Sequence, residues 1–491
     1  MAYPRPGWDL LGWVALGPLL ALAATAATPG AAFCEGWLAG LAFFVPLLRW
    51  LTHTMTTYST LNPPLAVLVL LLLSAYLALF WAGVTAALAW TTAGLGVGAL
   101  WLAPAFWVAG ELLRTYLLSG FPWGLVGYVP YRRLPILQVA AWTGVYGVSA
   151  LLVLANAALA RAWLARAWRT AALHLAAGGL VVAGAWAVGT ARVAPGPPGA
   201  GSDPETRAGV VVALVQGDIP QAVKWDQAFR EETLRIYAEL TREAAPGAQV
   251  VVWPEAAVPA LVRHEPEVMG QVVDLARQVG TPLLVGAPDS TGSGRAIHYL
   301  NSAFLVTSAG LQARYDKMHL VPFGEYVPLK RLLFFVEAIA ADVGDFTPGR
   351  APVVFPLPGA PFGTVICYEV IFPNLFRQFV REGASFMVNI TNDAWFGDSG
   401  GPLQHLAMVP LRAVENGVAV ARAANTGVSA FVAPSGAIGP ALPLERRGFL
   451  REHVSFRREG TFYTRHGDLF AYAMAAVSAT ALVAAGRGRA G

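Results

Sequence analysis

The sequence predicts a polytopic α-helical membrane domain joined to an extracytoplasmic α/β domain, and two observations support this prediction. The 491 residues are 56% hydrophobic and only 13% charged, whereas ordinary soluble domains carry about 25% charged residues. The hydrophobic residues are also unevenly distributed. Long apolar runs fill residues 1–195 and recur at 465–487, while the block between them alternates short apolar runs with amphipathic ones.

The long apolar runs predict the membrane-spanning helices. A helix needs about 20 mostly apolar residues to cross a bilayer, and we count the candidate spans with boundaries loose by several residues. They are seven segments, at about 8–27, 31–50, 63–89, 95–114, 135–160, 170–191 and 467–486. The last of these is the C-terminal transmembrane helix, and the others form the membrane domain.

Arginine residues in short loops predict the orientation of these spans. Arg161, Arg166 and Arg169 lie together between two spans, and Arg487 and Arg489 end the chain. Loops rich in Lys and Arg tend to stay in the cytoplasm. The span at 170–191 then leads outward and the last span returns, so the polar block between them lies outside the cytoplasm.

The polar block shows the pattern of an α/β domain. Proline and glycine mark a linker at 196–207, and the domain is expected over 208–460. Helical periodicity with a charged face occurs at 225–244 and 403–416. Strand-like runs lie at 210–215, 250–253, 282–286, 304–307, 363–366, 386–390 and 418–422. Alternation of strands with helices predicts buried sheets covered by helices.

Other functional classes find no support in the sequence. Basic runs with interleaved aromatic residues, which mark nucleic-acid binding, are absent. The eight histidines are scattered without metal-ligand spacing, so we expect no metal and no cofactor. Cys34 lies in a predicted span and Cys367 in the polar block, so we expect no disulfide between them.

Three chemically active side chains each follow a strand-like run in the polar block: Glu255, Lys317 and Cys367. A thiol at a strand end, just before a helix, favours a lowered pKa and a reactive thiolate, although a buried structural cysteine is an alternative. Glu255 fits a general base or a solvated loop residue, and Lys317 fits an oxyanion stabiliser or a surface lysine. The ordered set indicates a thiol acyl-transfer site.

Longer strings carry a resemblance that covers nearly the whole chain. Trp253-Pro254-Glu255, Tyr315-Asp316-Lys317 and Cys367-Tyr368-Glu369 resemble the Glu-Lys-Cys triad of the nitrilase superfamily. The strings at 215–221, 224–225, 317–328 and 392–397, with Phe121-Pro122-Trp123 in a membrane loop, are similar to the apolipoprotein N-acyltransferase family. The string at 397–402 resembles the serine motif of chymotrypsin-like proteases, but no matching histidine motif occurs upstream, so we set the protease interpretation aside.

The resemblance implies a nitrilase-like αββα sandwich and assigns roles within it. It implies that Cys367 is the nucleophile, Glu255 the base and Lys317 the oxyanion stabiliser, with Glu325 supporting the site. Four more positions match residues that line the family's substrate cleft, namely Trp225, Tyr368, Glu369 and Trp395. For the two tryptophans, ordinary packing stays an equally open reading.

The resemblance also implies the activity and its setting. The expected reaction takes a fatty acyl group from a membrane phospholipid, holds it as a thioester, and passes it to diacylglyceryl-cysteine of an apolipoprotein. The expected place is the bacterial inner membrane, with a monomeric enzyme whose catalytic domain faces the periplasm. The family usually has eight membrane helices, against the seven counted. A membrane-tethered amidase and a non-catalytic membrane binding protein are the alternatives.

Overall fold

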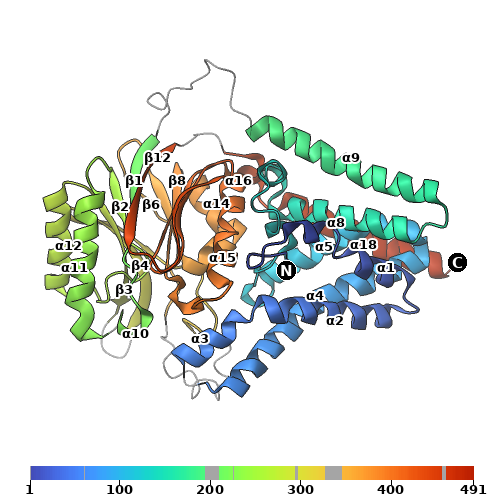
Figure 1. The fold of residues 1–491 in the computed structure, drawn as a ribbon, viewed down its shortest axis with the longest axis horizontal. Helices are drawn as coiled ribbons and strands as arrows, with labels where there is room; N and C mark the ends of the chain where they lie inside the picture. The colour runs from blue at the N-terminus through green and yellow to red at the C-terminus, as the bar shows by residue number, and fades with distance from the viewer. Residues whose placement is uncertain are drawn as a thin grey trace.

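The computed structural model describes residues 2–59, 61–193, 209–224, 226–292, 297–326, 346–455 and 460–490. Trp225 and the predicted linker at 196–207 lie outside the described residues. Figure 1 shows two parts side by side, a bundle of long helices and a sandwich of two sheets covered by helices. Both chain ends belong to the helical part (Figure 1).

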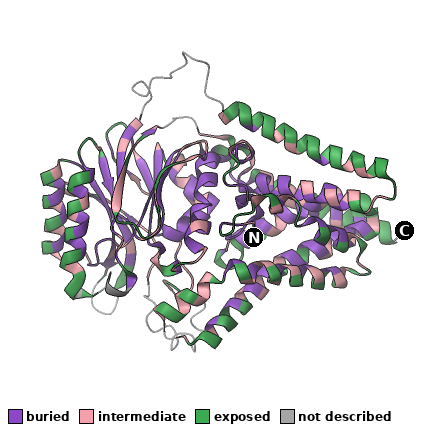
Figure 2. Cartoon of the chain, in the orientation of Figure 1, coloured by how far each residue is buried: buried purple, intermediate pink, exposed green. Residues whose placement is uncertain are grey.

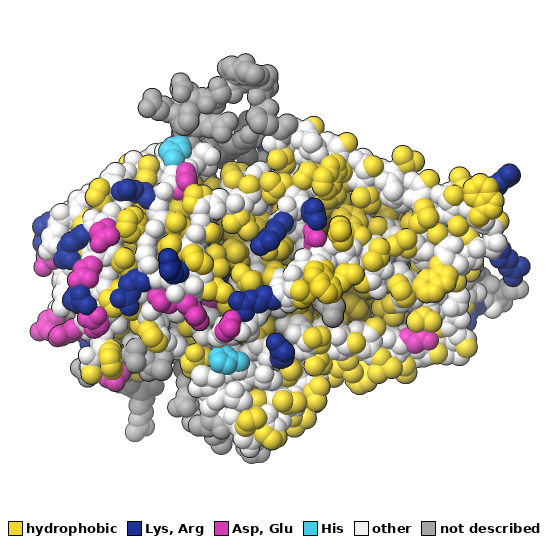
Figure 3. Space-filling model, viewed as in Figure 1, with side chains coloured by type: hydrophobic (Ala, Val, Ile, Leu, Met, Phe, Trp, Pro, Cys, Tyr) yellow, Lys and Arg dark blue, Asp and Glu magenta, His cyan; other side chains and the backbone are white. Residues whose placement is uncertain are grey.

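The helical half is apolar on its outside. Among the described residues, five helices are long and apolar enough to cross a membrane: α2 (Pro29–Leu47), α4 (Pro63–Leu95), α8 (Val145–Trp163), α9 (Trp168–Val193) and α18 (Leu469–Ala490). Helix α9 is exposed along nearly its whole length (Figure 2). In Figure 3 hydrophobic side chains dominate the surface of this half, while charged side chains gather over the sandwich.

Three predicted spans are not single long helices. Residues 8–27 form a short 3-10 helix, η1 (Asp9–Trp13), followed by α1 (Gly17–Thr25), and residues 95–114 form η2 (Val97–Leu102) followed by α5 (Ala103–Tyr116). In both of these the second helix carries a proline in its first turn, the place in a helix where the missing N–H of proline is tolerated. Residues 135–160 are divided among α6 (Leu134–Leu137), α7 (Ala140–Thr143) and α8, with Gly144 at a positive φ before α8.

The other half is the predicted αββα sandwich. Its sheets have the strand orders β12-β1-β2-β3-β4-β5 and β11-β10-β9-β8-β7-β6. The first sheet contains β1 (Gly209–Gln216), β2 (Val250–Val252), β3 (Leu283–Thr291), β4 (His298–Thr307), β5 (Gly310–Asp316) and β12 (Gly448–Ser455). The second contains β6 (Val354–Phe355), β7 (Phe362–Ile366), β8 (Phe386–Thr391), β9 (Val420–Ala424), β10 (Ser429–Val432) and β11 (Ile438–Leu442).

Helices cover both outer faces of the sandwich. Helices α11 (Gln227–Ala244) and α12 (Pro266–Val279) lie on the side away from the helical half, and α14 (Pro373–Arg381), α15 (Gly401–Leu406) and α16 (Val409–Asn416) lie toward it (Figure 1). All seven predicted strands are confirmed. The predicted helix at 403–416 is divided into α15 and α16, because a proline opens the first turn of α16.

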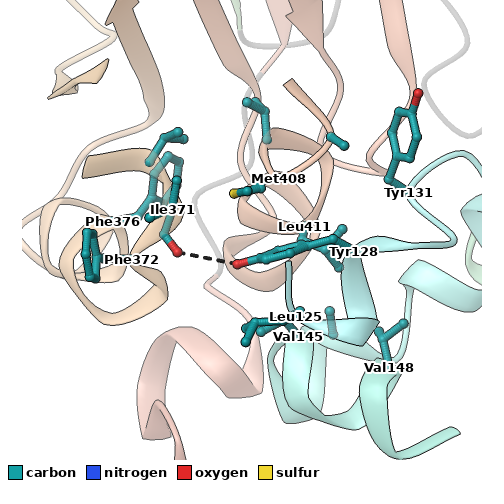
Figure 4. Packing of buried hydrophobic residues seen from close by; sticks show 14 of the residues in the cluster. Leu125, Tyr128, Tyr131, Val145, Val148, Ile371, Phe372, Phe376, Met408 and Leu411 are labelled. Atoms are coloured by element: carbon teal, nitrogen blue, oxygen red, sulfur yellow. Dashed lines mark hydrogen bonds between the residues drawn. The ribbon is translucent and has the colours of Figure 1, made fainter. Parts of the chain in front are cut away.

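The two halves are packed and hydrogen-bonded together. Tyr128 of the helical half donates its hydroxyl proton to the carbonyl of Ile371 at 3.4 Å, among the apolar side chains of Met408 and Leu411 (Figure 4). The carboxylate of Glu415 accepts a hydrogen bond from the amide at the start of α8 at 2.8 Å. One continuous hydrophobic cluster therefore runs through both halves and fixes the end of the sandwich that carries η7 (Cys367–Ile371) against the bundle.

Candidate active site

Glu255, Lys317 and Cys367 lie where β2, β5 and β7 end, and all three are buried. Their exposed fractions are 6%, 1% and 9%. Glu255 and Lys317 follow strands of the first sheet, and Cys367 follows the second sheet and begins the 3-10 helix η7 (Cys367–Ile371). The site is therefore assembled between the two sheets, from strand ends that are far apart in the chain.

A compact cluster of charges surrounds Lys317. Its ammonium donates to Glu325 at 2.9 Å and to Glu255 at 3.4 Å. The Asn301 amide bridges the two carboxylates, at 2.8 Å from Glu255 and 2.9 Å from Glu325. The backbone N–H of Asn392 donates to the second oxygen of Glu255 at 2.9 Å. Burial acts to lower the pKa of Lys317, but Glu325 and Glu255 outweigh it and raise that pKa, so the lysine stays charged.

The prediction of a lowered thiol pKa at Cys367 is wrong. Burial raises the pKa of this thiol, Glu255 raises it further, and Lys317 only partly offsets them. The helix that begins here has five residues, too few to act as a strong dipole. The resting thiol is therefore protonated at neutral pH, and its reactivity depends on a neighbouring base.

Two of the expected cleft residues stand between the sandwich and the helical half. The Tyr368 ring lies 6.4 Å from that of Phe121 and 5.1 Å from that of Phe372, centroid to centroid. Its buried hydroxyl has no hydrogen-bond partner among the described residues. Trp395 is 37% exposed and packs edge-on against Tyr58 at 5.0 Å. Trp225, the remaining aromatic candidate, lies outside the described residues.

Glu369 does not line a cleft, contrary to expectation. Its side chain is fully buried and accepts hydrogen bonds from the Tyr315 hydroxyl at 2.7 Å and from the amides of Met318, His319 and Ile366 at 2.7, 3.0 and 2.7 Å. Burial raises the pKa of Glu369 to about 7, although these hydrogen bonds act in the opposite direction. Its carboxylate ties the segment after Lys317 to the strand end before Cys367.

Sequence reasoning missed several groups around the site. Asn301 lies inside β4 and carries no motif signal. Lys224, in the short helix α10 (Gln221–Lys224), is 1% exposed and donates to the Glu255 carbonyl at 3.1 Å. Burial lowers the pKa of Lys224 to about 8, although Glu255 and Cys367 raise it. Lys224 belongs to the string at 224–225, which resembles the apolipoprotein N-acyltransferase family, so this resemblance could have pointed to it.

Two family models match most of the chain, and a solved structure shows a limited likeness. Residues 211–458 match the carbon-nitrogen hydrolase family, and residues 1–158 match the apolipoprotein N-acyltransferase N-terminal domain. The solved amidase from Nesterenkonia sp. AN1 is 21% identical, with a TM-score of 0.40, over 51% of this chain and 92% of its own.

Relatives match along almost the whole length. The apolipoprotein N-acyltransferase of Geobacter metallireducens is 41% identical over 99% of this chain and 92% of its own. The protein of the same name from Brucella suis is 34% identical over 86% of this chain and 80% of its own. An identity of this size over both halves means that the chain belongs to the apolipoprotein N-acyltransferase family.

Proposed function

We propose that this protein transfers a fatty acyl group from a membrane phospholipid to the N-terminal amine of diacylglyceryl-cysteine on apolipoproteins. The observation that supports this best is the buried thiol of Cys367 beside the buried side chains of Glu255 and Lys317, with Glu325 paired to the lysine. The domain that holds them is packed against an apolar helical bundle, which suits substrates anchored in lipid.

The first half-reaction forms a thioester. Glu255 accepts the proton of the Cys367 thiol while the sulfur attacks the ester carbonyl of the phospholipid. The negative charge that develops on the carbonyl oxygen is stabilised by the ammonium of Lys317. When the tetrahedral intermediate collapses, the carbon–oxygen ester bond breaks and Glu255 returns the proton to the leaving oxygen. A lysophospholipid departs and the acyl group stays on Cys367.

The second half-reaction forms the amide. The free amine of diacylglyceryl-cysteine attacks the thioester carbonyl, and Glu255 accepts a proton from that amine. Collapse breaks the carbon–sulfur bond, and the thiol of Cys367 regains its proton from Glu255. Glu325 keeps Lys317 in place through both steps, since it is the nearest carboxylate to the ammonium, at 2.9 Å.

The same proposal places the protein in a bacterial cytoplasmic membrane as a monomer, with the sandwich on the periplasmic side. The arginines after α8 and at the end of α18 support this orientation. Strand β12, which leads to the last helix, pairs with β1, which begins the sandwich, over Gly209↔Ser455 to Gln216↔Gly448. The chain therefore enters and leaves the sandwich side by side, as a domain held between two spans requires.

Mass spectrometry of the purified protein in phospholipid micelles tests the proposal. A mass increase of one acyl group is expected in a Cys34→Ala protein, where Cys367 is the remaining thiol, and none in a Cys367→Ala protein. Addition of a diacylglyceryl-cysteine peptide should remove the acyl group and yield the N-acylated peptide. If water discharges the thioester as fast as the peptide does, the protein is a hydrolase. If Cys367 is never acylated, phospholipid is not the donor.

A further inference from the structure

The backbone of Cys367 needs support from its surroundings. Its φ angle of 52° lies in the left-handed region, which is unfavourable for a non-glycine residue. Such a conformation persists only where neighbouring groups hold it, and the direction of the thiol depends on it. Among the described side chains, the one hydrogen-bonded to the carbonyl of Cys367 is His405, whose ring Nε2 lies 3.2 Å from that oxygen.

His405 is itself held in a fully buried polar network. Its Nδ1 lies 3.0 Å from a carboxylate oxygen of Asp393 and 3.1 Å from the guanidinium of Arg422. Arg422 also donates to Asp393 at 2.6 Å, and the Thr391 hydroxyl donates to Asp393 at 2.9 Å. None of the side chains of His405, Asp393 and Arg422 is exposed.

The proton on Nε2 of His405 follows from these neighbours. A neutral ring protonated on Nε2 accepts from Arg422 through Nδ1, and the charged ring donates to Asp393 through Nδ1 while Nε2 also carries a proton. A neutral ring protonated on Nδ1 would instead set a bare Nε2 against a carbonyl oxygen, with no hydrogen between them. The described partner of Nε2 is a carbonyl, which only accepts. In either state, therefore, His405 donates a hydrogen bond to the Cys367 backbone.

The helical half reaches the same ring. Trp123, in the loop 121–124 after α5, stacks on His405 with ring centroids 5.7 Å apart and an interplanar angle of 25°. Its indole N–H donates to Gln404 at 2.8 Å, and its carbonyl accepts from Arg114 at 2.7 Å. Gln404 also donates to the carbonyl of Leu47 at the end of α2, at 3.2 Å. His405 therefore lies between the buried Asp393–Arg422 ion pair of the sandwich and the loop 121–124 of the bundle, and it contacts both.

We propose that His405 is a positioning residue that holds the Cys367 backbone in its reactive conformation, and that Trp123 couples the loop 121–124 of the helical half to it. This inference rests on the proposed function for its consequence in acyl transfer. Its geometry is independent of lipid chemistry, because His405 contacts the backbone of the nucleophile and not the substrate. The proposal explains how the bundle governs the thiol: docking of the loop completes the support of the nucleophile.

Two substitutions of His405 separate its roles, both in the Cys34→Ala background. His405→Phe keeps an aromatic ring against Trp123 but removes the hydrogen bond, whereas His405→Gln keeps a donor. Because a misplaced reacting atom can slow a step by up to about a hundredfold, we expect His405→Phe to slow acyl-enzyme formation by at least about tenfold, with an unchanged KM for phospholipid. Alkylation of Cys367 by iodoacetamide should slow in parallel, and His405→Gln should recover most of both rates.

A matched control is available in the bundle. His174, in α9, also packs against a tryptophan, Trp101, at 5.8 Å, and its ring nitrogen contacts Arg161 of the bundle at 3.1 Å. His174→Phe should therefore leave acylation and alkylation at the rates of the Cys34→Ala protein. Trp123→Phe, which keeps a ring but loses the indole donor, should slow both reactions by a few fold, on the scale of one hydrogen bond.

Each outcome decides between explanations. A folded His405→Phe protein that is acylated and alkylated at the control rate overturns the proposal. If His405→Phe fails to fold, the test is made with His405→Gln and Trp123→Phe. A His405→Gln protein that is folded yet slow in alkylation shows that a donor to the Cys367 carbonyl is not sufficient. That result also overturns the proposal. If phospholipid acylates none of the proteins, the proposed function fails, while the alkylation rates still measure the positioning of Cys367.

Discussion

Glu111 in the helical half and Glu255 in the sandwich are both buried carboxylates, but their partners differ. Glu111 accepts hydrogen bonds from the backbone N–H of Val126 at 2.8 Å and from the indole of Trp107 at 3.1 Å. Its neighbour Arg114 likewise donates to backbone carbonyls of the loop 121–124. Glu255 instead contacts the ammonium of Lys317 and the amide of Asn301, which is shared with a second carboxylate.

The comparison teaches how to assign a role to a buried charge. A carboxylate whose hydrogen-bond donors are neutral groups fixes the path of the chain, because those bonds join separate stretches of it. A carboxylate that accepts from a charged side chain beside a nucleophile can gain and lose a proton during a reaction. By this criterion Glu369, in the sandwich, resembles Glu111 more than Glu255, since its four donors are three backbone amides and a tyrosine hydroxyl.

The largest effect is expected from Glu255→Gln. An amide cannot accept the thiol proton, so acyl-enzyme formation should fall by about 10²- to 10⁴-fold. Because the pKa of the Cys367 thiol is raised, the thiolate fraction of the variant is small at neutral pH and grows as pH rises, so its acylation rate should keep increasing with pH without a plateau near pH 9. Acylation followed by mass spectrometry at several pH values measures this.

Glu265→Gln is the matched control for that substitution, since Glu265 is a partly exposed carboxylate paired with Arg230 at 2.6 Å. It should be acylated like the unmodified protein. If a Glu255→Gln protein forms the thioester at the control rate, Glu255 is not the base. The contrast drawn between the two halves would then fail.

The sequence predicted those site residues that can be recognised from a single short stretch of chain. Glu255, Lys317 and Cys367 could be found because each directly follows an apolar run, and a strand end is visible in a single stretch of chain. Asn301 and His405 could not, because each lies within a strand or a short helix and gains its role from residues more than thirty positions away. The direction of the thiol pKa also depends on burial, which a local pattern does not report.

The same distinction holds for the fold. The central strands β1, β2, β3, β7, β8 and β9 are apolar runs paired largely in parallel, and all were predicted. The strands β6, β10, β11 and β12 were missed: β6 has only two residues, and β11 and β12 lie at sheet edges where polar and exposed residues interrupt the pattern. The breaks inside three predicted spans were also missed, because hydropathy is insensitive to a proline or glycine at which one helix ends and another starts.

Asn301→Asp tests whether the shared amide matters through charge. The substitution removes both donated hydrogen bonds and places a third carboxylate against Glu255 and Glu325. We expect acyl-enzyme formation to slow by roughly tenfold to a hundredfold, because like charges disfavour the ionised base. Asn301→Ala, which removes the hydrogen bonds without adding charge, should be the milder variant. Equal rates for the two variants would show that the charge balance of the cluster is unimportant.

Glu369→Gln tests the assignment of a positioning role inside the sandwich. The amide presents N–H groups where the carboxylate accepts four hydrogen bonds, so we expect a loss of about 2 kcal/mol in stability and a melting temperature lower by roughly 5 °C. Acylation should slow by about tenfold with KM unchanged, since Lys317 and Cys367 lose a shared anchor. Thermal unfolding in detergent and steady-state kinetics separate the alternatives. A raised KM at unchanged stability would instead indicate contact with substrate.

Glu111→Gln should have the smallest effect on chemistry. Glutamine keeps a carbonyl oxygen for Val126 and Trp107, and its amide nitrogen replaces the oxygen that has no hydrogen-bond partner among the described residues. Loss of the negative charge beside buried Arg114 should lower stability by about 1 kcal/mol, while acyl-enzyme formation stays within about threefold of the control. Glu35→Gln, on the partly exposed α2, controls for the loss of a carboxylate from the bundle. If Glu111→Gln abolished acylation in a folded protein, buried carboxylates with backbone partners would also take part in the reaction, and the division of roles between the two halves would be wrong.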